Sequence, residues 1–141
     1  MAIINGTSGS DTIAPGGVSP GVTGGVPSAA DDTINSSGGS DTIDGGGGSN
    51  FISYAGLGAG MTATSGASAY GGTATKGSGT DSFTNVRGII GSAQADTLVG
   101  SSDPTQILPY AIILRGGGGN DTINGLNNHL NYADTSMRRA P

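Results

Sequence analysis

The stretch "SSGGSDTIDGGGGSNFIS", residues 36–53, decides the fold. It contains two consecutive nonapeptides, "SSGGSDTID" and "GGGGSNFIS", and the eighth position of each is isoleucine, Ile43 and Ile52. The last three residues of a nonapeptide alternate polar, apolar and polar, which is typical of a short strand that buries one side chain. The glycines before them suit a sharp turn with positive φ angles. The stretch therefore predicts a coil in which turns and strands alternate.

The same period extends in both directions along the chain. Units run head to tail over residues 6–53, one of them three residues longer than the rest, and they resume over residues 91–131. A disordered glycine and serine chain has no reason to keep one position apolar. We expect two units per circuit of the coil, with parallel strands on two faces. The eighth positions, which should meet between the faces, are Ile13, Val22, Ile34, Ile43, Ile52, Leu98, Leu114, Ile123 and Leu130.

Composition and charge limit what such a chain can bind. It has 141 residues, of which 29 are glycine, 33% are hydrophobic and 4% are aromatic. The net charge is -5, and every acidic residue is aspartate, so nucleic acid and anionic membranes are poor partners. Cysteine is absent, which excludes disulfides and thiolate metal sites. No apolar run is long enough for a membrane span, and the first residues lack a signal-peptide pattern.

The units resemble the nonapeptide G-G-x-G-x-D-x-U-x, the calcium-binding repeat of the RTX (hemolysin-type, repeats-in-toxin) family. "GGGGNDTIN" at residues 116–124 fits every position, and "SSGGSDTID" and "GTSGSDTIA" fit most. The segment between the two blocks, ending in "GTDSFTNVRGIIGSAQADTLVG" at residues 79–100, also resembles what separates blocks of RTX repeats. The resemblance implies an all-β fold, a parallel β-roll or β-solenoid, with Ca²⁺ between turns stacked on the same side.

The sixth position of each unit is the implied ligand position. A carboxylate there can join the carbonyl oxygens of a glycine turn around calcium, which takes about 6 to 8 oxygen ligands. If unit n stacks on unit n+2, the best sites lie between Asp11 and Asp32 and between Asp96 and Asp121. The resemblance thus implies calcium ligands at Asp11, Asp32, Asp41, Asn50, Asp96 and Asp121.

Some of these positions are expected to bind more weakly. An amide oxygen carries no charge, so Asn50 weakens the site that it shares with Asp32. Asp41 faces Pro20 in this register, which breaks the site on that side. Aspartate also occurs in turns because it bonds the local backbone, so a solenoid can keep the residue without the ion. Asp31 and Asp44 fall outside the sixth position and are expected to be solvated or to make such turn bonds.

We interpret the whole chain, 1–141, as one β-solenoid domain made of repeat block 6–53, linker strands 54–90, repeat block 91–131 and a short tail 132–141. The Thr/Ala alternation of the linker predicts extra strands that continue the coil. Their expected core is Phe83, Val86, Ile89 and Ile90. Neither terminus is an obvious cap, and open solenoid ends expose strand edges. We therefore expect end-to-end self-association or a larger secreted assembly.

The sequence offers no catalytic constellation. His129 is the single histidine, and "GGGGND" lacks the lysine of a phosphate loop. We expect a non-catalytic calcium-binding module, extracellular or at the cell surface, that folds when calcium binds. Two alternatives remain open. One is a metal-independent solenoid whose flat Thr, Ser and Asn faces act in self-assembly or surface recognition, and the other is an accessory module of a polysaccharide-modifying enzyme.

Overall fold

The computed structural model describes residues 1–67, 70–100 and 112–125. Within these ranges it contains strands and no helix. The strands are β1 (Ile3–Asn5), β2 (Thr12–Ala14), β3 (Gly17–Val18), β4 (Thr33–Asn35), β5 (Thr42–Asp44), β6 (Phe51–Ser53), β7 (Thr62–Ala67), β8 (Gly71–Lys76), β9 (Gly79–Thr84), β10 (Gly88–Ile90), β11 (Thr97–Val99), β12 (Ile113–Arg115) and β13 (Thr122–Asn124). Leu130, His129 and the tail 132–141 lie outside the described residues.

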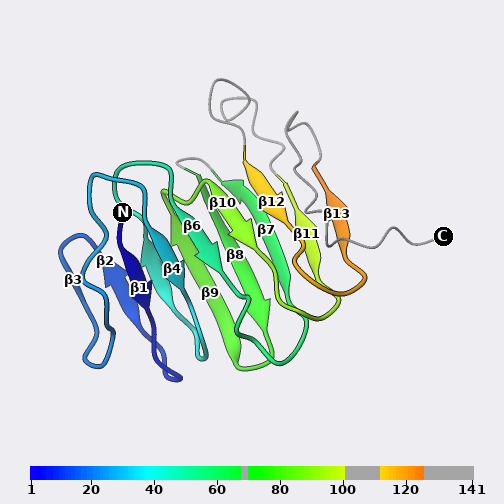
Figure 1. The fold of residues 1–141 in the computed structure, drawn as a ribbon, viewed down its shortest axis with the longest axis horizontal. Coiled ribbons are helices and arrows are strands. Elements are labelled where there is room, and N and C mark those ends of the chain that lie inside the picture. Colours follow the sequence, from blue (N-terminus) through cyan, green and yellow to red (C-terminus); the bar gives the residue numbers. More distant parts are fainter. Residues whose placement is uncertain (68–69, 101–111, 126–141) are drawn as a thin grey trace.

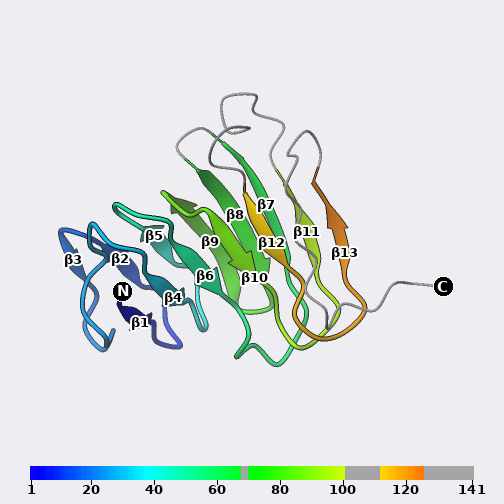
Figure 2. The same cartoon turned by 45° about the horizontal axis from the view of Figure 1, so that its top comes forward.

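The strands form two sheets that lie against each other as two layers (Figures 1 and 2). One sheet has the order β1-β4-β6-β10-β12, and all its pairings are parallel. The other has the order β13-β11-β7-β8-β9-β5-β2-β3. Consecutive repeats alternate between the two sheets, as β4, β5 and β6 do. The predicted parallel β-roll is confirmed.

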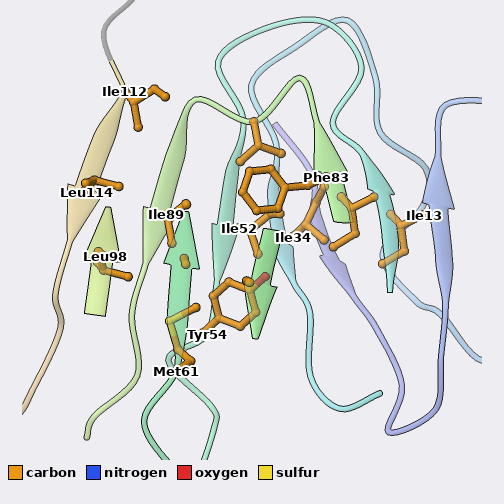
Figure 3. Packing of buried hydrophobic residues seen from close by; sticks show 14 of the residues in the cluster. Ile13, Ile34, Ile52, Tyr54, Met61, Phe83, Ile89, Leu98, Ile112 and Leu114 are labelled. Carbon is orange, nitrogen blue, oxygen red and sulfur yellow. The ribbon is translucent and has the colours of Figure 1, made fainter. Parts of the chain in front are cut away.

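Buried apolar side chains line the inner face of each sheet. In the five-stranded sheet the register aligns Ile4, Ile34, Ile52, Ile89 and Leu114. All of them are buried, and Figure 3 shows side chains of both sheets pointing into the space between the layers. Burying one such side chain contributes roughly 2 to 3 kcal/mol. The eighth positions predicted as core are buried with two exceptions among the described residues, Val22 and Ile123, which are partly buried.

One predicted repeat does not form a rung of the coil. Residues 15–23 were expected to stack like their neighbours, but β3 folds back antiparallel onto β2 instead. The sixth position of this unit is Pro20, and proline lacks the N–H that sixth-position residues such as Asp11 and Asp32 donate to the next turn. As a result β2 lies beside β5, with Ile13 opposite Ile43.

The displaced segment covers the strand edges at the N-terminal end of both sheets. Asn5 N donates to Thr23 O at 2.8 Å, and Thr23 N donates to Asn5 O at 3.0 Å. On the other sheet, Ser19 N donates to Thr12 O at 2.9 Å. The expectation that neither terminus has a cap is therefore wrong at this end, because backbone groups that an edge strand would expose are paired.

The linker forms strands, as expected. One of them, β10, continues the coil as a parallel strand between β6 and β12, whereas the other three do not. β7, β8 and β9 pair antiparallel and enter the second sheet as a meander between β11 and β5. Three of the four predicted core residues are buried, Phe83, Val86 and Ile89, while Ile90 is half-buried. The meander separates the turns of the two repeat blocks along this sheet. It also brings the end of β8 against the first block.

We predict that Gly24→Ala releases the N-terminal cap and promotes self-association. Gly24 has a φ of 94°, and a Cβ there would lie 1.9 Å from Ile3 O. The matched control is Gly25→Ala, which has a φ of 104° and open space around the added Cβ. Sedimentation velocity should show larger species for Gly24→Ala alone. Equal behaviour of the two variants would contradict a capping role.

Candidate metal centre

Six turns precede strands of the repeat blocks, and they are of two kinds. In the first kind, a Ser or Thr at the second position donates its N–H to the sixth-position carboxylate of the same turn, and we call these the Ser/Thr-closed turns: 6–11, 27–32 and 91–96. The second kind has positive φ angles at its second and fourth positions, and we call these the glycine turns: 36–41, 45–50 and 116–121. Both kinds end in the sixth-position aspartate or asparagine.

In a Ser/Thr-closed turn the carboxylate closes its own turn. Thr7 N donates to Asp11 Oδ2 at 2.6 Å, and the Thr7 hydroxyl also bonds this carboxylate while accepting from Gly9 N. Ser28 bonds Asp32 in the same way. Burial would raise the pKa of Asp32, but these hydrogen bonds, one from Ala2 N and the N-terminal charge hold it below its ordinary value. The carboxylate of Asp32 is thus stabilised as an anion by the chain itself.

The glycine turns lie so close to their neighbours that side chains would not fit. Gly39, Gly48 and Gly119 have φ angles of 82°, 78° and 94°, a region that residues with a Cβ resist. A Cβ at these positions would lie 2.3, 2.5 and 2.6 Å from backbone atoms of the adjacent turn. Glycine therefore permits both the turn and its stacking.

Each glycine turn stacks on one Ser/Thr-closed turn, and this gives three pairs of sixth-position residues. The backbone N–H of the first residue donates to Oδ1 of the second: Asp11 to Asp41 at 2.8 Å, Asp32 to Asn50 at 2.9 Å and Asp96 to Asp121 at 2.9 Å. The predicted stacking of the Asp96 turn with the Asp121 turn, and of the Asp32 turn with the Asn50 turn, is confirmed. The pairing of Asp11 with Asp32 is wrong, and so is that of Asp41 with Pro20, because residues 15–23 do not form a rung.

The second polar atom of the sixth residue is satisfied differently in each pair. Asn50 uses its amide nitrogen, which donates to Gly47 O at 2.8 Å and to Asn85 O at 3.1 Å. Its two side-chain atoms thus have partners within the protein. This pair of turns is closed by an uncharged group.

Asp41 uses a cation that the chain supplies. Its Oδ2 accepts from the Ser36 hydroxyl at 2.8 Å and from Lys76 Nζ at 3.1 Å. Lys76 also lies 3.0 Å from Oδ2 of Asp81, whose Oδ1 accepts from Asp41 N at 2.9 Å. Burial, together with the charge of Asp81, raises the pKa of Asp41.

Our sequence reasoning missed both Asp81 and Lys76. Asp81 precedes buried Phe83 by two residues, as Asp41 precedes Ile43, so this spacing could have found it. Lys76 has no periodic signal. Its one distinction in the sequence is that it is the single lysine.

Asp121 Oδ2 is buried and has no hydrogen-bond partner among residues 1–67, 70–100 and 112–125. Burial raises the pKa of Asp121, and the nearby charge of Asp96 raises it further. A Cβ on Gly116 would lie 2.2 Å from this oxygen, so glycine keeps the space beside it free of side-chain atoms. An unpartnered buried carboxylate oxygen is costly unless a cation meets it.

The groups around Asp121 suit calcium. Calcium binds carboxylate and carbonyl oxygens in tolerant geometry. The turn pair offers two carboxylates and the backbone carbonyls of the glycine turn. In the described ranges, no three or more His, Cys, Asp or Glu side chains form a group that could hold a metal. The remaining ligands would therefore come from backbone carbonyls, which the glycine turn presents.

Of the two aspartates expected to be solvated or to bond their own turn, Asp44 makes such a turn bond, whereas Asp31 is exposed and bonds the adjacent turn. Asp44 Oδ1 accepts from Gly46 N at 2.9 Å and from Asn85 Nδ2 at 2.7 Å. Asp31 Oδ1 accepts from Ser49 N at 2.8 Å.

The model of one protein family, described as the RTX calcium-binding nonapeptide repeat, matches four copies at residues 28–56 and 113–129. This chain carries RTX repeats. RTX repeats bind Ca²⁺ and are generally structural, non-catalytic modules. All three glycine turns lie inside the matched RTX residues, whereas turns 6–11 and 91–96 lie outside them.

No curated protein and no solved structure matches the chain. The described residues contain no helix that is long and apolar enough to cross a membrane.

Replacing the sixth-position carboxylate of one glycine turn by an amide, and the amide of another by a carboxylate, should have opposite effects on hydrogen exchange in the absence of calcium. Asp121→Asn removes a buried charge and can donate to the third-position carbonyl as Asn50 does, so the amides of β13 should exchange more slowly in chelator. Asn50→Asp should speed exchange in β4 and β6. The expected change is about 1 to 3 kcal/mol for one unpaired buried group. Hydrogen exchange with mass spectrometry measures it, and changes of the same sign in both variants would contradict the assignment.

Proposed function

We propose that this chain is a calcium-binding β-roll module in which the ion binds between turns 91–96 and 116–121. Asp121 and Asp96 would supply carboxylate oxygens, and the glycine turn would supply carbonyl oxygens. The observation that carries the proposal is Asp121 Oδ2, a buried carboxylate oxygen that has no partner in the described part of the chain.

Charge supports this placement. Asp96 Oδ2 accepts from Ser92 N at 2.6 Å, and its Oδ1 accepts from Met61 N at 2.8 Å, so the Asp96 carboxylate is fixed in place beside Asp121. Two neighbouring carboxylates repel each other at neutral pH, and a divalent cation removes this repulsion. Calcium bound there would therefore stabilise β11 and β13, because binding free energy adds to folding free energy.

Calcium ligation by Asp11, Asp32 and Asn50 remains a prediction, and ligation by Asp41 would have to displace the Lys76 ammonium from its Oδ2. Asp11 and Asp32 accept N–H and O–H donors within their own turns, and Asn50 is satisfied by two carbonyls. These residues already have partners that calcium would need to replace. Asp96 has such partners too, but it lies beside Asp121 Oδ2, which has none in the described part of the chain. We therefore expect calcium to bind first at Asp96 and Asp121.

The proposed setting is outside the cell. RTX repeat proteins are typically secreted, and extracellular calcium modules work at affinities of about 10⁻⁴ to 10⁻³ M. The module would act there as a non-catalytic structural or interaction unit.

Calcium titration tests the proposal. The wild-type chain should gain protection against hydrogen exchange in β11 and β13 as calcium rises, and isothermal titration calorimetry should detect binding. Asp121→Asn should weaken the binding at least tenfold, which corresponds to about 1.4 kcal/mol. Wild-type protection that ignores calcium, or a variant that binds as tightly as wild type, would contradict the proposal.

A second candidate function is surface recognition by the outer face of the larger sheet. The register aligns five threonines across neighbouring strands: Thr80, Thr75, Thr62, Thr97 and Thr122. Four of them are exposed and Thr97 is half-buried. Strands are spaced about 4.8 Å apart, so the row repeats hydroxyl groups at that interval. Such a row suits a ligand with repeating hydroxyl groups, such as a polysaccharide.

Binding to insoluble polysaccharides tests this second function. Thr75→Lys, in the middle of the row, should reduce retention of the chain by the polymer. The matched control is Thr12→Lys, another exposed threonine of the same sheet that lies outside this row. Retention that is absent in wild type, or equal in both variants, would contradict the idea.

A further inference from the structure

Lys76 is buried at the end of β8, where the meander meets the first repeat block. It is 5% exposed, and its neighbours Asp41 and Asp81 are 2% and 0% exposed. A lysine is rarely buried unless its charge is paired. The ammonium therefore has a specific role in this part of the fold.

The neighbours of the ammonium are all oxygens. Nζ lies 2.6 Å from Ser36 Oγ, 2.7 Å from Ser37 O, 3.1 Å from Asp41 Oδ2 and 3.0 Å from Asp81 Oδ2. A hydroxyl, a backbone carbonyl and two carboxylates are also the oxygen ligands that calcium uses. The shell around Nζ thus has the chemistry of a cation site.

The position of these oxygens within the turn matches the second block. Ser37 is the second residue of glycine turn 36–41 and has a φ of 64°, and Gly117 is the second residue of turn 116–121 with a φ of 83°. Asp41 and Asp121 are the sixth residues of the same two turns. In the first turn the ammonium meets the second-position carbonyl and the sixth-position Oδ2. In the other turn the corresponding Oδ2 has no partner in the described chain.

The remaining contacts of Asp41 and Asp81 do not neutralise their negative charge, so a cation is needed. Asp81 also accepts from the Tyr54 hydroxyl at 2.9 Å, and the Tyr54 ring centroid lies 5.7 Å from Nζ. Without the ammonium, two adjacent carboxylates would be buried with neutral donors alone. Removing one partner of a buried ion pair leaves an uncompensated buried charge, which is strongly destabilising.

We infer that Lys76 is a tethered cation that takes the place of calcium between turn 36–41 and the β8–β9 hairpin. The calcium expected at Asp41 does not fit there while the ammonium is present. The first block therefore folds without calcium, and the second block depends on it. The inference deepens the proposed function and rests on it only for the behaviour of the second block.

The arrangement also gives the meander a role. β8 and β9 are joined by a tight turn, with Lys76 paired to Gly79. The hairpin thus delivers Lys76 and Asp81 together to the side of turn 36–41. Losing the ammonium should then open a site that calcium can fill, since both carboxylates and the Ser37 carbonyl remain.

The test compares wild type with Lys76→Met, which keeps an apolar stem and removes the charge. In chelator, the amides of β5 and β9 should be protected in wild type and exchange at least tenfold faster in the variant. Added calcium should restore their protection, and equilibrium dialysis should count one more bound ion than in wild type. Protection that survives in Lys76→Met, or that calcium does not restore, would overturn the inference.

A double variant keeps the test informative if Lys76→Met unfolds the block. Lys76→Met with Asp81→Asn removes one charge of each sign, so protection of β5 should return in chelator without calcium. Failure to return would show that packing of the lysine stem, and not its charge, is what matters. Each of these measurements reports on hydrogen exchange of the first block in chelator. A failure of the proposed function would instead appear as calcium-independent exchange in β13 of wild type.

Amine labelling provides a second measurement on the unmodified chain. Lys76 is the single lysine, and Met1 is 85% exposed, so a reagent that acetylates amines has an internal reference at the N-terminus. In chelator, Lys76 should react at least tenfold more slowly than the N-terminal amine. Equal loss of both amines would contradict a first block that folds without calcium.

Discussion

The sixth-position side chain of each glycine turn is the constraint on which the rest of the structure depends. Stacking buries this side chain, and one of its oxygens accepts an N–H from the turn beneath. The other polar atom must then find a partner, because an unpaired polar group is costly inside a protein. The chain meets this requirement with an ammonium at Asp41 and with carbonyls at Asn50. Asp121 Oδ2 has no partner among the described residues, and calcium suits this position.

This constraint explains why units with similar sequences differ in chemistry. Their strands are interchangeable, since each contributes one aliphatic residue to a row between the sheets. Their turns are not, since the carboxylate of a Ser/Thr-closed turn accepts the second-position N–H of its own turn, whereas the sixth residue of a glycine turn accepts an N–H from the adjacent turn. Stacking one turn of each kind gives every pair one satisfied carboxylate and one group that needs a partner. The repeat therefore sets the architecture, while the partner of one polar atom sets the dependence on calcium.

Much of the fold follows from the sequence, because the eighth position is a local signal. An isoleucine at a fixed place in a glycine-rich unit predicts a short strand, and parallel stacking follows from two units per circuit. The pairing of Asp96 with Asp121 could also be predicted, since no irregular unit separates their turns on that side of the roll. The pairing of Asp11 with Asp41 could not be predicted by counting repeat units, because the unit that contains Pro20 does not stack as a turn of the coil. The role of Lys76 was hidden for another reason: it depends on an antiparallel meander that has no nonapeptide period.

The location of bound calcium tests this account most directly. Crystals grown with calcium and measured for anomalous scattering would place each ion in the structure. The account predicts an ion between turns 91–96 and 116–121, bound by Asp121, and none between Asp41 and Asp81 while Lys76 is present. An ion at Asp41 and Asp81 in the wild-type chain, or no ion at Asp121, would contradict it.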